Sequence, residues 1–463
     1  MTEPLPSLAQ AALRPYWFDT IAPEPARPAL ATDLSADLAI IGGGFTGLWT
    51  ALQARRRDPQ ARIVLIEAGR TGNAASGRNG GFCAPSISHG VGNALRRWPG
   101  EAGELVRLGR KNLDGFAQDV EAYGLSIDFE RAGKLSLAEQ PWQVEGLRAT
   151  AANCARFGVA GEWLSGDALD ARFRSPVYKA GFYEPNYAQL NPAKTVAELR
   201  RVALSLGVEI HEQTPVTELR ETATGLTLVT PGGAVHAARA VLATNAAPPL
   251  LGHLKSSIIP IFDYAIMTRP LSDDELAAIG WTDRHSVADS GNQFHYIRKS
   301  TDNRILWGGY DAVYHFGSRR DASLLDRTET YNKLAAHFAR ALPPLAHVPF
   351  THAWGGIIDT SARTTFFAGL AARGRLAYAM GFTGQGVSAS RFAALTMLDL
   401  LAGEETERTR LAMLRTRPFP FPPEPLRWLG IRWAQAGLAS EDLTGQRSRF
   451  NRVLDAFGVG FDS

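Results

Sequence analysis

One stretch near the start of the chain constrains its fold more than any other, namely DLAIIGGGFTG at positions 37–47. Its apolar run, Leu38–Ile41, is suited to a buried parallel strand. Three glycines follow the run in G-x-G-x-x-G spacing, at Gly42, Gly44 and Gly47. Apolar residues then recur at helical spacing, so the glycines mark a strand-to-helix turn. Such a turn lets the backbone approach a pyrophosphate and sets the free N–H groups of a helix N-terminus against the phosphates.

A second buried strand is predicted at Arg62–Ile66, and it ends in Glu67, 20 residues after Gly47. A carboxylate in that place accepts hydrogen bonds from the ribose hydroxyls of an adenosine and repels a 2′-phosphate. The alternative is a glycine-rich turn next to a surface glutamate. Because the strand, turn, helix and second strand are all present, we favour an adenine-dinucleotide site.

Composition limits the remaining classes of protein. The 463 residues exceed the usual size of one hydrophobic core, so we expect two domains. A formal net charge of +3 is too small to indicate nucleic acid or an anionic membrane as a partner. Cys83 and Cys154 make no disulfide framework and lack zinc-site spacing, so we predict no metal. No secretory signal or membrane-spanning apolar run is visible, and we expect a soluble cytoplasmic protein.

The character of the residues changes several times along the first half of the chain. Residues 1–35 are rich in proline and include neighbouring aromatic residues, so we expect an arm docked on the surface. Residues 69–90 are mostly small, as suits a backbone threaded against a flat ligand, although glycines that serve only turns are the alternative. Helical spacing dominates residues 91–171. A helix–strand unit and a hairpin then lead to a buried strand that ends at Thr244 and Asn245.

A different pattern begins at Ile258, where three strands rich in aromatic residues are predicted. The segment HAWGGIID follows at positions 352–359, and a buried strand at Leu376–Met380 leads into a second glycine-rich turn, GFTGQG, and a helix. We therefore predict a fold of the α/β and α+β classes, in which a discontinuous Rossmann-like domain binds the nucleotide and an antiparallel sheet forms a substrate domain.

The predicted boundaries follow these changes of pattern. We assign residues 36–90, 172–257 and 350–405 to the nucleotide-binding domain, and residues 91–171 and 258–349 to the substrate domain. Residues 1–35 form the N-terminal arm, and residues 406–463 form a C-terminal extension. Tryptophans and arginines alternate in that extension, which we expect to pack on the protein itself or on a second subunit rather than on a membrane surface.

Four separated segments, GGGFTG with Glu67, AASGRNGG, VLATNA and MGFTGQGVSAS, together resemble the D-amino-acid oxidase and glycine oxidase superfamily of FAD-dependent amine oxidoreductases. The most similar branch is the one that contains γ-glutamylputrescine oxidoreductase. The resemblance spans residues 30–403 and implies an FAD-binding domain and a sheet whose inner face covers the isoalloxazine.

The same resemblance implies which residues bind FAD. It places the pyrophosphate at the first glycine-rich turn, the ribose at the end of the second strand, and the flavin ring edge at the GFTGQG turn, where N–H groups stabilise negative charge on the reduced ring. The implied residues are Gly42, Gly44, Phe45, Thr46, Gly47, Glu67, Ala68, Ser76, Asn79, Gly80, Gly81, Val216, Thr244, Asn245, Gly381, Phe382, Thr383, Gly384, Gln385, Gly386 and Val387.

The sequence departs from the family pattern in two places. Relatives that attach FAD covalently use a Cys near the C-terminal turn or a His in the small-residue stretch; this turn has no Cys, and His89 lies beyond the expected position. We therefore predict noncovalent FAD, with Cys83 as the nearby thiol to be tested. Many relatives also carry an Asp and a Pro before the last strand, where this chain has SARTTFFAG.

The resemblance also implies that an amine loses a hydride to flavin N5 and becomes an imine, which water hydrolyses to an aldehyde or keto acid. Such chemistry requires no general base, which agrees with the lack of a Ser-His-Asp or paired-carboxylate signature. We expect the pocket residues to be Tyr264, His295, Tyr296, His352 and Trp354. Packing within the sheet is the alternative role for each of them.

Two basic residues next to the candidate pocket residues have possible roles of their own. Arg298 is a candidate for binding a substrate carboxylate, and Lys299 for assisting reaction with oxygen, although solvent exposure is the simpler interpretation of both. The predicted partners are a small amine and O2 or another electron acceptor. A dehydrogenase that uses an acceptor other than oxygen and a noncatalytic FAD-binding subunit stay open as alternatives.

Overall fold

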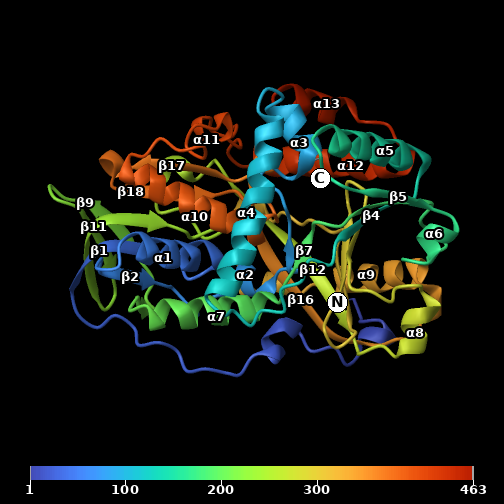
Figure 1. Ribbon diagram of the computed structural model, residues 1–463, viewed down its shortest axis with the longest axis horizontal. Coiled ribbons are helices and arrows are strands. Elements are labelled where there is room, and N and C mark those ends of the chain that lie inside the picture. The colour runs from blue at the N-terminus through green and yellow to red at the C-terminus, as the bar shows by residue number, and fades with distance from the viewer. Residues whose placement is uncertain (1, 461–463) are drawn as a thin grey trace.

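The computed structural model describes residues 2–460 and contains two large sheets that lie side by side (Figure 1). The first is mainly parallel and has the strand order β17 (Phe367–Ala371), β18 (Leu376–Met380), β11 (Gly233–Leu242), β1 (Leu34–Ile41), β2 (Ile63–Ile66) and β8 (Glu209–His211). Two further strands, β9 (Glu218–Glu221) and β10 (Leu226–Thr230), extend it from β11 as an antiparallel hairpin.

Helices cover the first sheet as expected for a nucleotide-binding fold. Helix α1 (Phe45–Arg57) follows β1 directly, α7 (Pro192–Ser205) precedes β8, and α10 (Gly386–Ala402) follows β18. Asn191 caps α7, since its side chain accepts a hydrogen bond from the N–H of Lys194. Helix α10 ends at Gly403, whose φ of +69° is in the left-handed region.

The second sheet is mixed and forms the other half of the molecule. Its strand order is β16 (Phe350–Thr360), β12 (Ile259–Thr268), β15 (Ile305–Gly309), β14 (His295–Lys299), β13 (Ser286–Asp289), β4 (Lys134–Ala138), β6 (Ala180–Glu184) and β5 (Glu162–Ser165). Helix α9 (Thr328–Ala341) packs on one face, where Leu334 and Phe338 join an apolar core with residues of β12 and β15. The combination of a Rossmann-like sheet with a second sheet confirms the predicted fold class.

The segments combine differently from the predicted boundaries in two places. Residues 350–360 form β16, which pairs with β12 along its whole length and therefore belongs to the second sheet. Helices α3 (Gly90–Arg97) and α4 (Ala102–Ala122) precede the first strand of that sheet, but Leu105 and Phe116 of α4 pack in the core of the first unit. An ion pair of 2.7 Å between Asp119 and Arg391 fixes α4 to α10.

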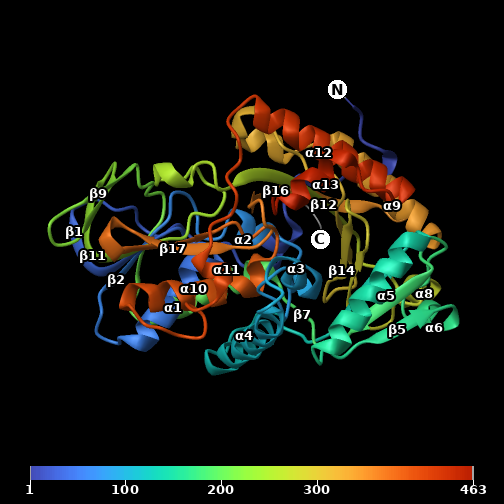
Figure 2. The ribbon, with the colours of Figure 1, turned by 90° about the horizontal axis from the view of Figure 1, so that it is seen from above.

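Both ends of the chain lie across the second sheet. The N-terminal arm contains a short 3-10 helix, η2 (Tyr16–Thr20), in which Trp17 is buried and donates from Nε1 to the carbonyl of Asn79 at 2.9 Å. At the other end, α12 (Leu426–Thr444) and α13 (Arg449–Ala456) lie above β12 and β16 (Figure 2). Ile431 of α12 packs against Ile259 and Ile261 of β12. Across residues 2–460, we find no helix long and apolar enough to cross a membrane.

Candidate active site

The first glycine-rich turn joins β1 to α1 through a backbone that leaves no space for side chains. Gly42 has a φ of +110°, and a Cβ there would overlap the carbonyl oxygen of Ala243. A Cβ on Gly47 would overlap the carbonyl oxygen of Gly42 and lie 3.3 Å from Cγ2 of Ile40. The Oγ of Ser76 accepts a hydrogen bond from the N–H of Phe45 at 2.9 Å. The turn and the N-terminus of α1 are therefore held open toward the space between the two sheets.

Glu67 follows β2 at the carboxyl end of the parallel strands, as predicted. Its two carboxylate oxygens accept hydrogen bonds from the N–H groups of Gly43 at 2.7 Å and Gly69 at 2.8 Å. These bonds fix the direction of the carboxylate and leave lone pairs for further donors. Ala68 is exposed, and Val216 packs at the edge of the same apolar cluster as β2.

The small-residue stretch contains the short helix α2 (Ala75–Arg78), and Asn79 organises the turn that follows it. The Oδ1 of Asn79 accepts from the N–H of Gly81 at 2.8 Å, while its Nδ2 donates to the carbonyls of Ala75 and Ser76 at 3.0 and 2.9 Å. Gly80 faces the second sheet, and a Cβ there would lie 3.0 Å from the ring of Tyr296. This segment therefore passes between the two units of the molecule with little side-chain bulk.

The second glycine-rich turn is held by Asp359 at the end of β16. The carboxylate of Asp359 accepts from the N–H groups of Gly381 at 2.5 Å and Phe382 at 3.1 Å. Burial raises the pKa of Asp359 from 3.8 to about 7, although these donors oppose the shift. The N–H groups of Gly381 and Phe382 are thus engaged by the protein, and the residues that line the open space begin with Phe382 and continue to Val387.

A cavity of about 360 Å³ lies between these turns and the inner face of the second sheet. The predicted cofactor residues that line it are Gly44, Phe45, Thr46, Ser76, Asn79, Gly80, Gly81, Asn245, Phe382, Thr383, Gly384, Gln385, Gly386 and Val387. The others, Gly42, Gly47, Glu67, Ala68, Val216, Thr244 and Gly381, lie outside this lining. One cavity therefore brings together residues of the segments 44–46, 76–81 and 382–387, the last of which lies more than 300 positions after the other two.

Of the five predicted pocket residues, Tyr296 and Trp354 line the cavity. Trp354 is buried and donates from Nε1 to the carbonyl of Arg78 at 2.9 Å. The hydroxyl of Tyr296 donates to Oδ2 of Asp263 at 2.7 Å. Asp263 also lines the cavity, and it was not predicted, although a single acid within the apolar strand IIPIFDYAIMT is the kind of signal that marks a site.

Tyr264 and His295 lie outside the cavity because side chains alternate between the two faces of a strand. Asp263 faces the cavity, so its neighbour Tyr264 faces the other side, where its hydroxyl donates to the carbonyl of Leu324 at 2.8 Å. His295 precedes Tyr296 and contacts Asp289 at 2.6 Å and His337 at 3.0 Å. The structure therefore contradicts the expectation that these two residues line the pocket, and both instead pack on the other face of the sheet.

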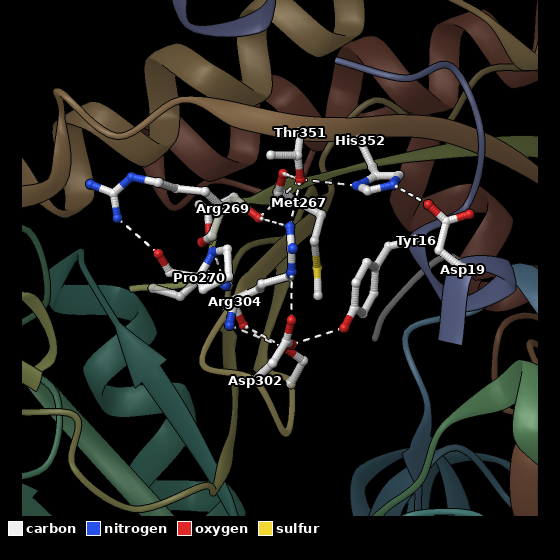
Figure 3. Close-up of polar contacts among 12 residues, drawn as sticks. Tyr16, Asp19, Met267, Arg269, Pro270, Asp302, Arg304, Thr351 and His352 are labelled. Atoms are coloured by element: carbon white, nitrogen blue, oxygen red, sulfur yellow. Dashed lines mark hydrogen bonds and ion pairs between the residues drawn. The ribbon is translucent and has the colours of Figure 1, made fainter. Parts of the chain in front are cut away.

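His352 lies on the same face as Trp354 but beyond the end of the cavity, beneath the N-terminal arm (Figure 3). Its Nε2 contacts Oδ2 of Asp19 at 2.9 Å, and its Nδ1 contacts the hydroxyl of Thr351 at 2.9 Å. Burial lowers the pKa of His352. Tyr16 of the same arm donates to Asp302 at 2.8 Å. The structure therefore places His352 in a network that fastens the arm to the second sheet.

Arg298 and Lys299 also lie outside the cavity lining. The guanidinium of Arg298 donates to the carbonyl of Gly80 at 3.0 Å and to that of Leu190, and burial lowers its pKa to about 9. Lys299 donates from Nζ to the carbonyl of Trp281 at 2.9 Å. Neither lines the cavity, so neither is placed to bind a substrate carboxylate or to assist oxygen there.

Comparisons with known proteins agree with this geometry. A family model described as "FAD dependent oxidoreductase" matches residues 37–400, which is more than half of the chain. The protein belongs to this family of FAD-dependent oxidoreductases. Its predicted family and its predicted cofactor, FAD, are thereby confirmed.

Individual relatives cover nearly the whole protein. The chain is 27% identical to gamma-glutamylputrescine oxidoreductase of Escherichia coli over 91% of its own length and 94% of that protein. It is 25% identical to glycine oxidase of Geobacillus kaustophilus, over 80% and 94% of the two chains. The crystal structure of that glycine oxidase superposes with a TM-score of 0.67 at 23% identity, covering 80% of this chain and 96% of the other.

The residues around the cavity fit FAD on grounds that are independent of family membership. The glycine turns exclude side chains where a pyrophosphate must approach the backbone. Within residues 2–460, the buried Oγ1 of Thr244 and Oδ1 of Asn245 have no hydrogen-bond partner, which is unusual for buried polar atoms. Both atoms follow β11 at the carboxyl edge of the parallel sheet, where a cofactor is expected.

The FAD-dependent oxidoreductase closes its cavity with the C-terminal extension, a contribution that the sequence did not reveal. Ile431, Gln435 and Leu438 recur on one face of α12 and line the cavity. The carboxylate of Asp442 accepts from the N–H groups of Asn292 at 2.7 Å and Gln293 at 2.9 Å, and these two residues also line it. The helix therefore supplies one wall of the site and fixes a neighbouring loop.

Proposed function

We propose that this FAD-dependent oxidoreductase oxidises a primary or secondary amine to an imine, which water then hydrolyses to an aldehyde or keto acid. The observation that supports this proposal best is the single cavity that the FAD-binding turns share with the aromatic inner face of the second sheet. FAD, when bound there, supplies the hydride acceptor. The two relatives described above are named for γ-glutamylputrescine and glycine, and these names support an amine as the substrate class.

The protein's own contribution is to position the amine and to exclude water. Tyr296 and Trp354 form aromatic walls, and Ile431 and Leu438 of α12 add apolar contacts. An apolar enclosure of this kind favours a neutral amine and holds its C–H bond close to the cofactor. It also protects an imine from premature hydrolysis.

We infer that FAD is held without a covalent bond. Cys83 is fully buried, and burial raises the pKa of its thiol far above the usual range, so the nucleophilic thiolate is disfavoured. His89 lines the cavity, but its Nδ1 contacts the carbonyl of Thr364 at 2.9 Å. Precipitation with acid tests this inference: yellow flavin in the supernatant supports it, and flavin retained in the pellet contradicts it.

The proposed reaction is tested by anaerobic mixing of the purified yellow protein with a panel of amines. The panel contains diamines, their γ-glutamyl derivatives, N-methyl amino acids and D-amino acids. We expect at least one to bleach the flavin absorbance, whereas a protein that no amine bleaches would support a noncatalytic FAD-binding subunit.

Oxygen is the proposed acceptor, and mixing the reduced protein with air-saturated buffer tests it separately. Rapid return of the yellow colour supports an oxidase. Slow return supports a dehydrogenase that uses another acceptor.

A further inference from the structure

Asp263 is an acid in an otherwise apolar part of the cavity wall. Its neighbours on the same face of β12, Ile261 and Ala265, also line the cavity and carry no charge. Asp263 is only partly exposed, and it lines the cavity. Burial raises its pKa from 3.8 to about 6.

Three strands cooperate to hold this carboxylate in place. Tyr296 projects from β14 and reaches Asp263 on β12, so its ring must cross the intervening strand β15. At that crossing β15 has Gly308, where a Cβ would overlap the ring of Tyr296. The glycine therefore has a specific purpose, which is to let the tyrosine hydroxyl approach Oδ2 of Asp263 at 2.7 Å.

The protein itself supplies no cation to this carboxylate. In the described part of the chain, no ion pair joins Asp263 to a lysine, arginine or histidine. Arg78 lines the same cavity, but its guanidinium donates to the carbonyls of Asn73 at 2.8 Å and Gly355 at 3.1 Å. A carboxylate in such surroundings lowers stability unless a ligand supplies the missing positive charge.

Lys134, His89 and Asp359 of the cavity are either distant from Asp263 or have partners of their own. Lys134 is on β4, four strands away from β12, which corresponds to about 19 Å across the sheet. His89 contacts the carbonyl of Thr364, and Asp359 is occupied with the N–H groups of the second turn. The position next to Asp263 and Tyr296 is therefore suited to a cation and offers no counterion for a carboxylate.

We propose that Asp263, positioned by Tyr296, binds the ammonium group of the substrate and accepts one of its protons. This inference rests on the proposed amine oxidation and names the residue that prepares the substrate. One N–H bond of the ammonium breaks, an O–H bond forms on Asp263, and the electron pair stays on nitrogen as the lone pair of a neutral amine. No electrons leave the substrate in this step, so it needs no oxidant.

The proposal also specifies the class of substrate. An α-amino acid carries a carboxylate on the carbon next to its nitrogen, and that carboxylate would lie close to Asp263 with no cation to pair with. A diamine or polyamine derivative lacks this repulsion. The site is therefore selective for amines without a carboxylate on the reacting carbon.

The test compares the holoenzyme with three variants. Asp263→Asn keeps the shape and still accepts a hydrogen bond from Tyr296, but it removes the charge. Asp263→Glu restores the charge, and Asp289→Asn is a matched control in a partly buried acid that contacts His295 outside the cavity. The rate of anaerobic flavin bleaching is measured from pH 5 to pH 9 with 1,4-diaminobutane and with glycine.

We expect the wild-type protein to react with 1,4-diaminobutane at least about 10-fold faster than with glycine, and Asp263→Asn to lose about 100-fold of that rate at neutral pH. The rise of the rate with pH near 6 should disappear in Asp263→Asn, return partly in Asp263→Glu and persist in Asp289→Asn. An Asp263→Asn protein with the wild-type rate and pH profile would overturn the proposal, and so would a wild-type preference for glycine.

A binding measurement distinguishes failure of the Asp263 proposal from failure of the proposed amine oxidation. If no amine bleaches the wild-type protein, the proposed function fails, but calorimetric binding of 1,4-diaminobutane at pH 8 still tests Asp263. A Kd raised at least about 10-fold in Asp263→Asn supports the cation site. Equal affinity in the two proteins, or no binding to either, contradicts it.

Discussion

The substitution Gly47→Ala adds a single methyl group to the first glycine-rich turn, and so tests the proposed role of this turn in binding FAD. In the structure that methyl carbon would overlap the carbonyl oxygen of Gly42 and lie 3.1 Å from its carbonyl carbon and 3.3 Å from Cγ2 of Ile40. The obstacle is the backbone of the turn itself, which cannot move aside as a flexible side chain can. Helix α1 must therefore shift away from β1, and the N–H groups at its start shift with it.

The size of the effect follows from the cost of overpacking. Inserting a methyl group into a close-packed region costs about 1–3 kcal/mol, and a backbone obstacle places Gly47 at the upper end of that range. If the strain falls mainly on the FAD-bound state, 3 kcal/mol corresponds to a loss of affinity of roughly 100-fold. The ratio of flavin to protein absorbance after gel filtration measures this loss, and thermal unfolding of the same samples measures the strain.

Gly146→Ala provides the control. Gly146 lies within α5 (Pro141–Arg156), is exposed, and has no atom within 4 Å of the position that a Cβ would take. Alanine there should stabilise the helix by up to about 1 kcal/mol and leave the flavin content unchanged. A Gly47→Ala protein that retains a full complement of FAD and unfolds at the wild-type temperature would refute the close approach of α1 to the turn.

Three further predictions concern the second sheet and the wall of the cavity that α12 supplies. The substitution His352→Ala removes the contact with Asp19 and should lower the melting temperature, while the rate of anaerobic bleaching stays within about threefold of wild type. A much larger loss of rate would show that His352 acts in the active site. Folding raises the pKa of Asp263 from 3.8 to about 6, so the folded protein binds the proton of this carboxyl group more tightly than the unfolded chain does. As pH rises from about 4 to about 6, the ionised carboxylate therefore lowers the free energy of unfolding, by up to about 3 kcal/mol above pH 6. Asp263→Asn should therefore raise the free energy of unfolding in urea at pH 8 but hardly at pH 4, and an equal effect at both pH values would contradict this. Leu438→Trp should narrow the cavity and slow the oxidation of long amines more than that of short ones, whereas uniform slowing would argue against α12 as a wall of the site.

Local sequence signals predicted the two glycine-rich turns of the nucleotide-binding sheet. The turns after β1 and β18 depend on glycines at fixed spacing between a strand and a helix, and both lie where the sequence predicts them. Ser76 and Asn79, which the resemblance implied as cofactor residues, line the cavity, and the small residues around them let the chain pass between the two units. Such features are determined by residues close together in the chain.

The substrate half depended on information that a local pattern does not contain. Adjacent aromatic residues such as His295 and Tyr296 point to opposite faces, and only the packing of α9 on one face shows which of the two lines the cavity. The register between β12 and β16 places Asp263 opposite Gly356, a pairing between residues 93 positions apart. Tertiary pairing of this kind also explains why β16 joined the second sheet and why α4 joined the first.

The C-terminal extension shows the same limit more strongly. Its alternating tryptophans and arginines indicated packing, but nothing in the sequence showed that one face of α12 would close the cavity. The crystal structure of the Geobacillus kaustophilus glycine oxidase covers 80% of this chain, and the family model ends at residue 400, before this helix begins. A wall of the site thus comes from a segment outside the matched family region.

An anaerobic titration decides whether this protein uses FAD to oxidise an amine. The FAD-bound enzyme is titrated with the amine that bleaches it fastest, and the carbonyl product is counted alongside the loss of flavin absorbance. We expect one carbonyl to be formed for each flavin reduced, with complete bleaching at one equivalent of amine. Bleaching without a carbonyl product, or no bleaching by any amine of the panel, would contradict it.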